Sequence, residues 1–507
     1  MVLLEAESLS AGVSTGLMIT ATCIFLYTLQ RYASDLTPPG PFALPIIGNM
    51  WAFPFTKPWL AFLDWRDTYG TRRYQAIDDL LEKRGNLYSD RPRYTVVGEL
   101  MGLDRGMPIM QYDDPKRRLQ RKLARTALSA DAVRKYHGVQ SRVAALMCWA
   151  FLSDPGRFRD HARLAAGRII MAVTYGLPVS GAEHEYITHA EETMEMITQA
   201  TMPGAFMADI IPILKHLPAW VPFLSPKRHA RKGRAMIERL VETPFNHVVE
   251  EMAAGTALPS FTHDLLDDMS NAAEDDGEYK QAVLWSAGSL YGAGGETTYT
   301  TVLVFLICMA QHPQIQKKAQ EELDSLIGSD RMPAITDRGK LPYIEAIIKE
   351  VMRWKVALPF AIPRRVDRDD VYKGYRIPAG SIVIPNVWAM GMDVPSKYPA
   401  DEFVPERFLE DRPPVDPATY AFGFGRRVCP GKLLAENSVF LLITSILFCC
   451  NVSLPFTVDE YGEKRRAEMS VEFTTSLVSY PLPFECTIEP RSAGRSEVVK
   501  RASASVE

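Results

Sequence analysis

The most informative stretch of this chain is residues 422–431, which read FGFGRRVCPG. Its glycines let the backbone turn tightly and approach a flat ligand, and the amide groups of such a loop can hydrogen-bond a sulfur and hold it as a thiolate. Arg427 stands two residues before Cys429 and can pair with a carboxylate of that ligand. A predicted helix follows over residues 432–449, and the dipole at its N-terminus also favours an anionic sulfur. The combination is typical of a cysteine thiolate that binds a haem iron and increases the electron density on the metal.

The other cysteines differ from Cys429 in their surroundings. The chain has 7 cysteines, an odd number with no CxxC pair and no zinc-type spacing, so we expect neither a disulfide framework nor a zinc site. Most of them stand in apolar runs such as residues 447–450, where a free thiol behaves as a small hydrophobe. A buried structural cysteine is the alternative interpretation of Cys429, but a core cysteine needs neither glycines nor arginines beside it.

A second motif interrupts a long apolar helical run at residues 291–298, which read YGAGGETT. Each glycine lowers helix propensity by about 1 kcal/mol relative to alanine, so the glycines need another reason to stand there. Gly294 would leave space against the face of a flat ligand, while Glu296 and Thr297 supply a carboxylate and a hydroxyl that can relay protons in a buried site. The alternative is that the small residues serve close helix packing or break the helix.

A third motif places opposite charges on one helix face. Glu350 and Arg353 stand three residues apart in a predicted helix, a spacing at which their side chains can pair. Such a pair is usually a solvated surface contact. If it were buried, removing either partner would leave an uncompensated charge and would be strongly destabilising.

These motifs resemble those of the cytochrome P450 family, the haem-thiolate monooxygenases. The family's cysteine loop reads FxxGxRxCxG, and its defined positions match Phe422, Gly425, Arg427, Cys429 and Gly431. The resemblance implies haem b as the cofactor, Cys429 as the axial iron ligand and Arg427 on a haem propionate. The other site residues follow from the same resemblance: the oxygen-activation motif has Thr297 and Glu296 as catalytic residues and Gly294 beside the haem, and the buried structural network is Glu350, Arg353 and Arg407.

The resemblance covers roughly residues 36 to 490 and implies a cytochrome P450 fold, mainly α with a smaller β region. The residue pattern agrees, because helical periodicity dominates up to about residue 350 and short strand-like pieces, such as residues 370–375, come later. We therefore expect one large domain, residues 35–507. Its last residues, about 491–507, are polar and predict a flexible tail.

The N-terminus predicts a membrane anchor over residues 1–34. Residues 8–30 are 23 uncharged residues, and as a helix they would span roughly 34 Å against a hydrocarbon core of about 30 Å. Acidic residues precede this span and Arg31 follows it, which argues against a cleaved signal peptide and favours a cytosolic body. A signal peptide or a buried helix is the alternative. We expect a single-pass membrane protein, and the resemblance to microsomal members of the family implies the membrane of the endoplasmic reticulum.

The composition excludes several other classes of protein. The chain has 507 residues, with 57 Lys+Arg against 61 Asp+Glu and a formal net charge of -4. This balance provides no basic field for nucleic acid, so we expect no nucleic-acid partner. A hydrophobic content of 47% argues against a disordered chain.

Three positions depart from the family pattern. After Tyr69-Gly70 the family makes two strands, which need roughly 12 to 15 residues with their turn, and the short segment 71–76 indicates that this block is missing. The helix that normally carries WxxxR lacks the Trp, and Arg121 is its candidate propionate ligand. The usual Pro-His is Pro363-Arg364, and Arg364 can pair with a propionate at least as well as His.

The expected function is oxidation, by hydroxylation or a related reaction, of a hydrophobic small molecule with O₂. The chain has no flavin or NAD fingerprint, so we expect electrons from a separate NADPH-cytochrome reductase. Likeness to microsomal fungal secondary-metabolism members implies a terpenoid, polyketide or indole-derived substrate. Two alternatives stay open: a haem-binding variant that the missing strands impair, and an isomerase or dehydratase that keeps the haem. By position, the substrate pocket is expected at residues 94–111, 197–206, 284–296, 356–362 and 476–477.

Overall fold

The structure, a computed structural model, describes residues 74–504 except 203, 222–225, 272–276, 394 and 459–463. Before residue 74 it describes residues 56–69, 49–54 and 37–41, together with positions 18, 20–22 and 24–26, which are helical. The predicted anchor over residues 1–34 therefore lies outside the described residues, apart from these few positions.

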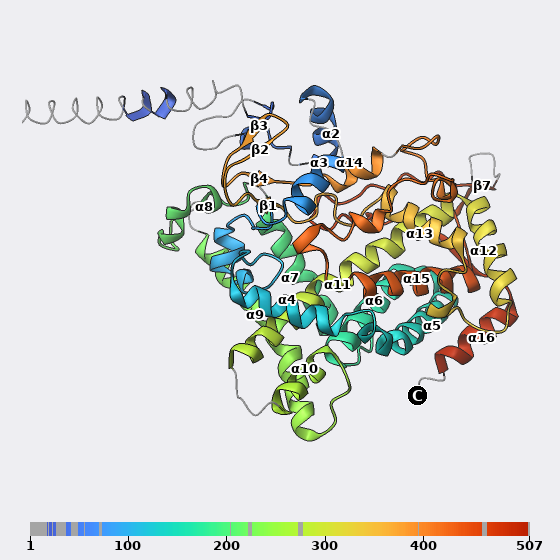
Figure 1. Cartoon of the computed structure of the whole chain (residues 1–507). Helices are drawn as coiled ribbons and strands as arrows, with labels where there is room; N and C mark the ends of the chain where they lie inside the picture. The colour runs from blue at the N-terminus through green and yellow to red at the C-terminus, as the bar shows by residue number, and fades with distance from the viewer. Residues whose placement is uncertain are drawn as a thin grey trace, which may run out of the picture.

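The described body is mainly helical with a smaller β region, as the sequence predicts (Figure 1). Its α-helices are α2 (Pro58–Tyr69), α3 (Tyr74–Ile77), α4 (Pro115–Ala127), α5 (His137–Ser153), α6 (Phe158–Tyr175), α7 (Glu185–Thr201), α8 (Met207–Ile210), α9 (Lys227–Ala254), α10 (Phe261–Asn271), α11 (Gly277–Gln311), α12 (Pro313–Ile327), α13 (Pro342–Trp354), α14 (Val387–Met392), α15 (Lys432–Cys449) and α16 (Ala493–Ala504).

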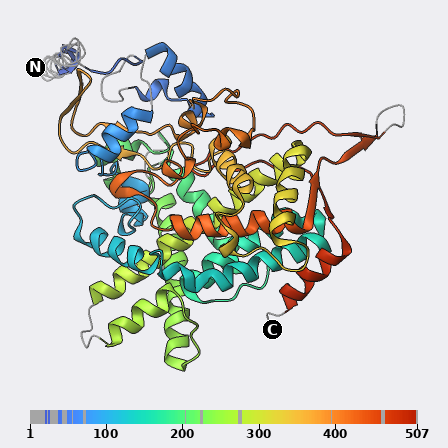
Figure 2. The same ribbon diagram turned by 45° about the vertical axis from the view of Figure 1, so that its right-hand side comes forward.

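The strands form short antiparallel pairs. They are β1 (Arg364–Arg365) with β4 (Ile382–Val383), β2 (Asp370–Tyr372) with β3 (Tyr375–Ile377), β5 (Cys450–Ser453) with β8 (Thr487–Pro490), and β6 (Phe456–Val458) with β7 (Lys464–Arg466). Figure 2 shows the β6–β7 pair extending away from the helices. The helices, and not the strands, therefore build the core.

Helix α11 occupies the centre of the body and positions the site (Figure 1). It packs against α4, α6, α9 and α15, and its apolar residues 302–310 are buried. The glycines do not break it. A Cβ on Gly288 would lie 2.6 Å from a methyl group of Val241, and one on Gly294 would lie 2.5 Å from a methyl group of Ile170. These glycines therefore allow α9 and α6 to approach α11 closely.

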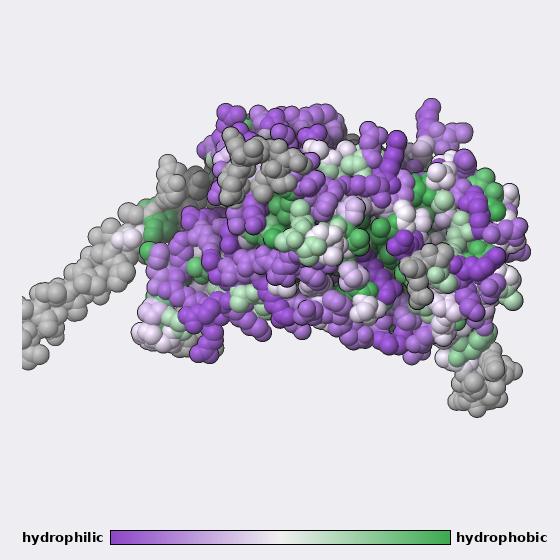
Figure 3. All heavy atoms as spheres, turned by 90° about the horizontal axis from the view of Figure 1, so that it is seen from below, coloured by the Kyte–Doolittle hydropathy of each residue, from purple (hydrophilic) through white to green (hydrophobic). Residues whose placement is uncertain are grey.

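Helices α11 and α15 are, among the described residues, the ones long and apolar enough to cross a membrane. Within the most apolar stretch of each, 61% and 78% of the residues are buried in the body. Such burial is expected of core helices, whose whole circumference is covered by protein. On the face of the molecule shown in Figure 3, by contrast, hydrophilic residues dominate.

The prediction of a flexible tail from residue 491 is wrong, because residues 493–504 form helix α16, which packs against α5. Arg491 and Arg495 both pair with Asp324 of α12, with closest distances of 2.7 and 2.8 Å. Val499 is fully buried on the packed side. The tail has a polar composition overall, but one face of it is apolar enough to dock.

The strand block that the sequence lacks after Gly70 is missing from the described structure as well. Helix α2 ends at Tyr69 and α3 begins at Tyr74, so residues 70–73 alone connect them. In the described part of the chain no strand precedes β1, and an isolated bridge between Asp90 and Arg365 is the pairing found there. The sheet around β1 and β4 is therefore curtailed.

Candidate active site

A cavity of about 460 Å³ lies between α11 and the loop that precedes α15. Cys429 lines it from the loop, while Ala293, Gly294 and Thr297 line it from α11. Loop and helix are far apart in the sequence, so tertiary packing creates the space between them. We call it the cysteine cavity.

Two glycines hold the loop that carries Cys429 in its shape. Gly423 and Gly425 have φ angles of +80° and +51°, left-handed values that favour glycine. A Cβ on Gly425 would also lie 2.4 Å from the backbone oxygen of Leu81. The amide of Cys429 donates a hydrogen bond to the backbone oxygen of Phe422 at 2.8 Å. These contacts fix the position of the sulfur.

Cys429 keeps accessible surface although much protein surrounds its thiol, and it lines the cysteine cavity. Burial raises the pKa of this thiol, against the opposing effects of the Gly431 amide, which donates to the sulfur, and of the nearby cations Arg121 and Lys432. Among the described residues, no group of three or more His, Cys, Asp and Glu side chains could hold a metal ion. A metal bound by this sulfur would therefore need most of its ligands from a non-protein group, as a porphyrin supplies them.

Five arginines line the cysteine cavity. Arg338 pairs with Glu345 at 2.9 Å, and we call the other four the cavity arginines: Arg91, Arg121, Arg364 and Arg427. Within the described part of the chain none of them forms an ion pair, and their hydrogen bonds go to backbone oxygens. Arg91 and Arg427 each donate to three such oxygens, and Arg121 donates to that of Val428 at 2.8 Å. Arg91, Arg364 and Arg427 are buried, and Arg121 is half-buried. Buried cations without a counter-charge are unfavourable, so this arrangement indicates an anionic ligand.

Arg364 is the cavity arginine with an unsatisfied donor. Its Nη2 donates to the backbone oxygen of Phe424 at 2.9 Å, whereas its Nη1 is buried without a partner. Burial, together with repulsion from Arg427, lowers the pKa of Arg364 to about 9. Burial, together with repulsion from Arg91 and other arginines, lowers the pKa of Arg427 to about 8. The two carboxylates of a haem would supply both the missing charge and the missing acceptors.

Helix α11 places the second motif opposite Cys429. The hydroxyl of Thr297 donates to the backbone oxygen of Ala293 at 3.2 Å, and both residues line the cavity. Gly294 lines it too, yet its missing Cβ would collide with Ile170 of α6, so close helix packing explains this glycine as well. Glu296 does not line the cysteine cavity and borders the neighbouring one. Burial, strengthened by nearby carboxylates on α7, raises the pKa of Glu296 to about 7.

A second cavity of about 460 Å³ adjoins the first and shares Ala293 and Thr297 with it. All five predicted pocket segments contribute lining residues. Sequence reasoning missed other lining residues, which come from α2, β4, α9 and the segment before α2: Phe53, Trp59, Ile237, Leu240 and Ile382. Because most of the lining is apolar, the cavity suits a hydrophobic small molecule next to Thr297.

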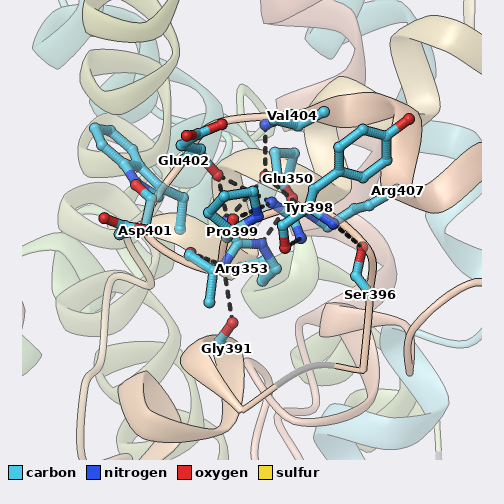
Figure 4. A network of polar contacts seen from close by, with 12 residues as sticks. Glu350, Arg353, Gly391, Ser396, Tyr398, Pro399, Asp401, Glu402, Val404 and Arg407 are labelled. Carbon is cyan, nitrogen blue, oxygen red and sulfur yellow. Dashed lines mark hydrogen bonds and ion pairs between the residues drawn. The ribbon is translucent and has the colours of Figure 1, made fainter.

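A separate polar network surrounds Glu350, which is buried (Figure 4). Arg353 donates to both carboxylate oxygens of Glu350, at 2.7 and 2.8 Å, and Arg407 donates to one of them at 3.0 Å. The amide of Val404 donates to that same oxygen at 2.8 Å. The remaining guanidinium donors reach the backbone oxygens of Gly391, Tyr398, Pro399, Ala400 and Glu402. All three charged side chains are fully buried, and we call them the structural cluster.

The thiolate loop, the cavity arginines and the long distal helix define a haem-thiolate protein. The chain matches the cytochrome P450 family over residues 38–471. It is 38% identical to cytochrome P450 monooxygenase claR of Ampulloclitocybe clavipes, over 94% of this chain and 91% of that protein. It is 34% identical to cytochrome P450 monooxygenase 105 of Postia placenta, over 95% and 94% of the two chains. It is also 34% identical to cytochrome P450 monooxygenase COX2 of Coprinopsis cinerea, over 95% of each.

The chain therefore belongs to the cytochrome P450 family. This confirms the resemblance that the sequence motifs indicate, and with it the class of enzyme and the haem cofactor. Arg91 is a site residue that sequence reasoning missed. It follows Asp90 in an ordinary polar segment, and its place at the cavity depends on backbone oxygens of Pro108, Ile362 and Pro363, which are distant in the chain.

Proposed function

We propose that this monooxygenase inserts one oxygen atom of O₂ into a hydrophobic small molecule, with electrons from a separate NADPH-dependent reductase. The observation that carries the proposal is the apolar cavity that adjoins the cysteine cavity at Ala293 and Thr297. A substrate held there would lie next to the reacting centre and away from bulk water.

The residues present fit a haem. Cys429 would bind its iron, the glycines of the loop would allow its face to approach the backbone, and the cavity arginines would hold its propionates. The unpartnered Nη1 of Arg364 fits a propionate oxygen in particular. When bound, the haem supplies the redox chemistry that activates O₂.

The protein's own part in the reaction is to deliver protons and exclude water. Glu296, whose pKa is raised to about 7, can hold a proton near neutral pH and release it to the hydroxyl of Thr297. Thr297 lines both cavities and so can pass the proton toward the reacting centre. These two residues support oxygen activation over an isomerase or dehydratase reaction, which needs no such proton supply.

The alternative of an impaired variant is not favoured. The missing strand block falls between α2 and α3 in the chain, whereas the cysteine loop, the cavity arginines and the motif on α11 are all in place. The similar proteins of Ampulloclitocybe and Postia are named as monooxygenases and match more than nine-tenths of this chain. Their fungal origin supports a role in fungal secondary metabolism, with a terpenoid, polyketide or indole-derived substrate. The apolar span over residues 8–30 supports a single-pass anchor in the endoplasmic reticulum membrane with a cytosolic catalytic domain.

The test combines the purified, haem-loaded protein with a reductase, NADPH and a panel of hydrophobic candidate substrates. We expect the carbon monoxide difference spectrum of a thiolate-bound haem and an oxygenated product from at least one substrate class. Thr297→Ala should keep the spectrum and the rate of NADPH use but lower the yield of product per NADPH by about tenfold or more. A normal product yield from Thr297→Ala, or a thiolate spectrum without any product across the panel, would contradict the proposal.

A further inference from the structure

A third, smaller cavity of about 50 Å³ lies between α6, α7 and α11, on the outer side of Glu296. Its lining includes Glu191 of α7, Arg163 of α6, and Glu296 and Tyr299 of α11. Glu296 borders both this space and the apolar cavity. A carboxylate in that position separates the substrate side of α11 from a small chamber, whose lining is otherwise mostly apolar and includes Ile170, Ile187 and Met194.

The chamber has the features of a water site. The Nε of Arg163 is buried without a hydrogen-bond partner, which is an unsatisfied donor at the chamber wall. A cavity needs roughly 10–15 Å³ for each water, and a buried water needs polar partners. The chamber offers that room and three polar partners, namely the carboxylates of Glu191 and Glu296 and the free Nε–H of Arg163.

The chamber is also connected to solvent through its outer carboxylate. The side chain of Glu191 is 37% exposed, and Nη1 of Arg163 donates to it at 3.1 Å. Arg163 in turn donates to Asp160, at 3.1 Å, and the Asp160 side chain is 34% exposed. Glu191 therefore contacts bulk water at one end and the chamber at the other.

We propose that Glu191 and the chamber form the outer half of a proton relay that recharges Glu296 from solvent. The proposal rests on the function proposed above for Glu296 and Thr297. When Glu296 gives its proton to the Thr297 side, a chamber water gives one to Glu296, Glu191 gives one to that water, and solvent returns one to Glu191. No charge accumulates along the path, and Glu191 acts only through Glu296, so it is a positioning residue of the relay.

The electrostatics agree with this direction of transfer. Burial raises the pKa of Glu191, against the opposing effect of Arg163. Burial raises the pKa of Glu296, and the negative charges of Glu191 and Glu195 raise it further. The other titratable and charged groups near the pair are Arg159, Asp160 and Arg163 of α6, Tyr291 and Tyr299 of α11, and Tyr480 of the C-terminal segment.

The chain offers a matched control one helical turn away. Glu195 stands on the same helix, carries the same charge toward Glu296 and does not line the chamber. We expect Glu191→Gln to lower the rate of product formation at the low-pH plateau by about tenfold, and Glu195→Gln to change it by less than about twofold. Glu191→Asp should restore part of the rate. An equal plateau in the two Gln variants would overturn the relay.

The pH profile separates proton delivery from electrostatics. In the wild type, coupled product formation should fall as the pH rises through about 7, because Glu296 then loses its proton. Both Gln variants remove a negative charge and so lower the pKa of Glu296, which shifts this fall to lower pH in both. The relay predicts that the low-pH rate of product formation is reduced in Glu191→Gln alone. If Glu191→Gln only shifted the pH at which the rate falls, and kept the full low-pH rate, the relay would be contradicted.

A second readout does not depend on turnover. The protonated carboxyl of Glu296 gives an infrared band that Glu296→Gln should remove, and rapid mixing of the haem-loaded protein with D₂O follows its exchange. We expect exchange at least about tenfold slower in Glu191→Gln than in Glu195→Gln. Equal exchange rates in Glu191→Gln and Glu195→Gln would overturn the relay, whether or not a product is found. If the wild type nevertheless makes product, the proposed function stands and the relay alone is refuted.

Discussion

The structural cluster and the cavity arginines are two largely buried groups of arginines that differ in how their charge is satisfied. In the structural cluster, Arg353 and Arg407 share the carboxylate of Glu350, and further donors reach backbone oxygens. The cavity arginines have no carboxylate partner among the described residues, and Arg364 keeps an unpartnered donor. A buried cation that the fold satisfies is part of the scaffold, whereas one that the fold leaves unsatisfied marks where an anionic ligand binds.

Glu350→Ala should have the largest effect, because it leaves Arg353 and Arg407 buried without their carboxylate. Removing one partner of a buried pair costs about 3–5 kcal/mol, against a total stability of roughly 5–15 kcal/mol for a typical protein. We expect little or no folded protein, with or without haem. The measurements are the yield of the reduced carbon monoxide band and the free energy of unfolding in urea.

A surface pair near the same cluster provides the control for this variant. Lys318 contacts Glu406 at 2.7 Å, and the two side chains are 57% and 28% exposed. Lys318→Ala should change the free energy of unfolding by less than about 1 kcal/mol, because exposed pairs contribute little. A normal haem spectrum from Glu350→Ala would remove the distinction between the two arginine groups.

Arg364→Met tests the cavity arginines. Unlike Glu350→Ala, it should weaken haem binding and leave the stability of the haem-free protein nearly unchanged. It removes an unsatisfied buried cation, so the haem-free protein should unfold within about 1 kcal/mol of the wild type. Haem affinity should fall by about tenfold or more, since hydrogen bonds to a charged group contribute about 1.5–3 kcal/mol. Haem transfer to an acceptor protein measures the affinity. Arg368→Met, at an exposed site nearby, should change neither quantity, and unchanged haem retention in Arg364→Met would refute an anion-binding role.

The two groups were not equally predictable from the sequence. Glu350 and Arg353 stand on one helical turn, and Arg427 stands beside Cys429, so short motifs are enough to find them. Arg91 is held by backbone oxygens of residues 108, 362 and 363, and no local pattern records such long-range contacts. The general fold class was predictable for a related reason, because helical periodicity is local.

Predictions failed or stayed incomplete where packing between distant elements decides the outcome. The polar tail hides an apolar face, and whether Val499 is buried depends on α5, which lies far back in the sequence. The role of Gly294 depends on the rotation of α11 relative to Ile170 of α6, which the motif itself does not specify. The apolar cavity recruits α2 and β4 for the same reason.

Gly391→Ala should have the smallest effect of the three variants, and it tests whether the structural cluster can be disturbed without changing the cavity arginines. A Cβ on Gly391 would lie 2.4 Å from the backbone oxygen of Arg353, and this glycine's own oxygen accepts from Nη1 of Arg353 at 2.8 Å. Two helix backbones must then separate, which we expect to cost about 1–3 kcal/mol in unfolding free energy. Haem affinity of the folded fraction should be unchanged.

Gly138→Ala is the matched control, because Gly138 is also helical and an added Cβ there would meet nothing within 4 Å. Gly138→Ala should be as stable as the wild type or more stable by up to about 1 kcal/mol, which is the difference in helix propensity between glycine and alanine. If Gly391→Ala instead weakened haem binding without changing the unfolding free energy, α14 would be coupled to the cysteine cavity. The structural cluster and the cavity arginines would then not be independent, because a backbone shift at Arg353 would have changed haem binding without weakening the fold.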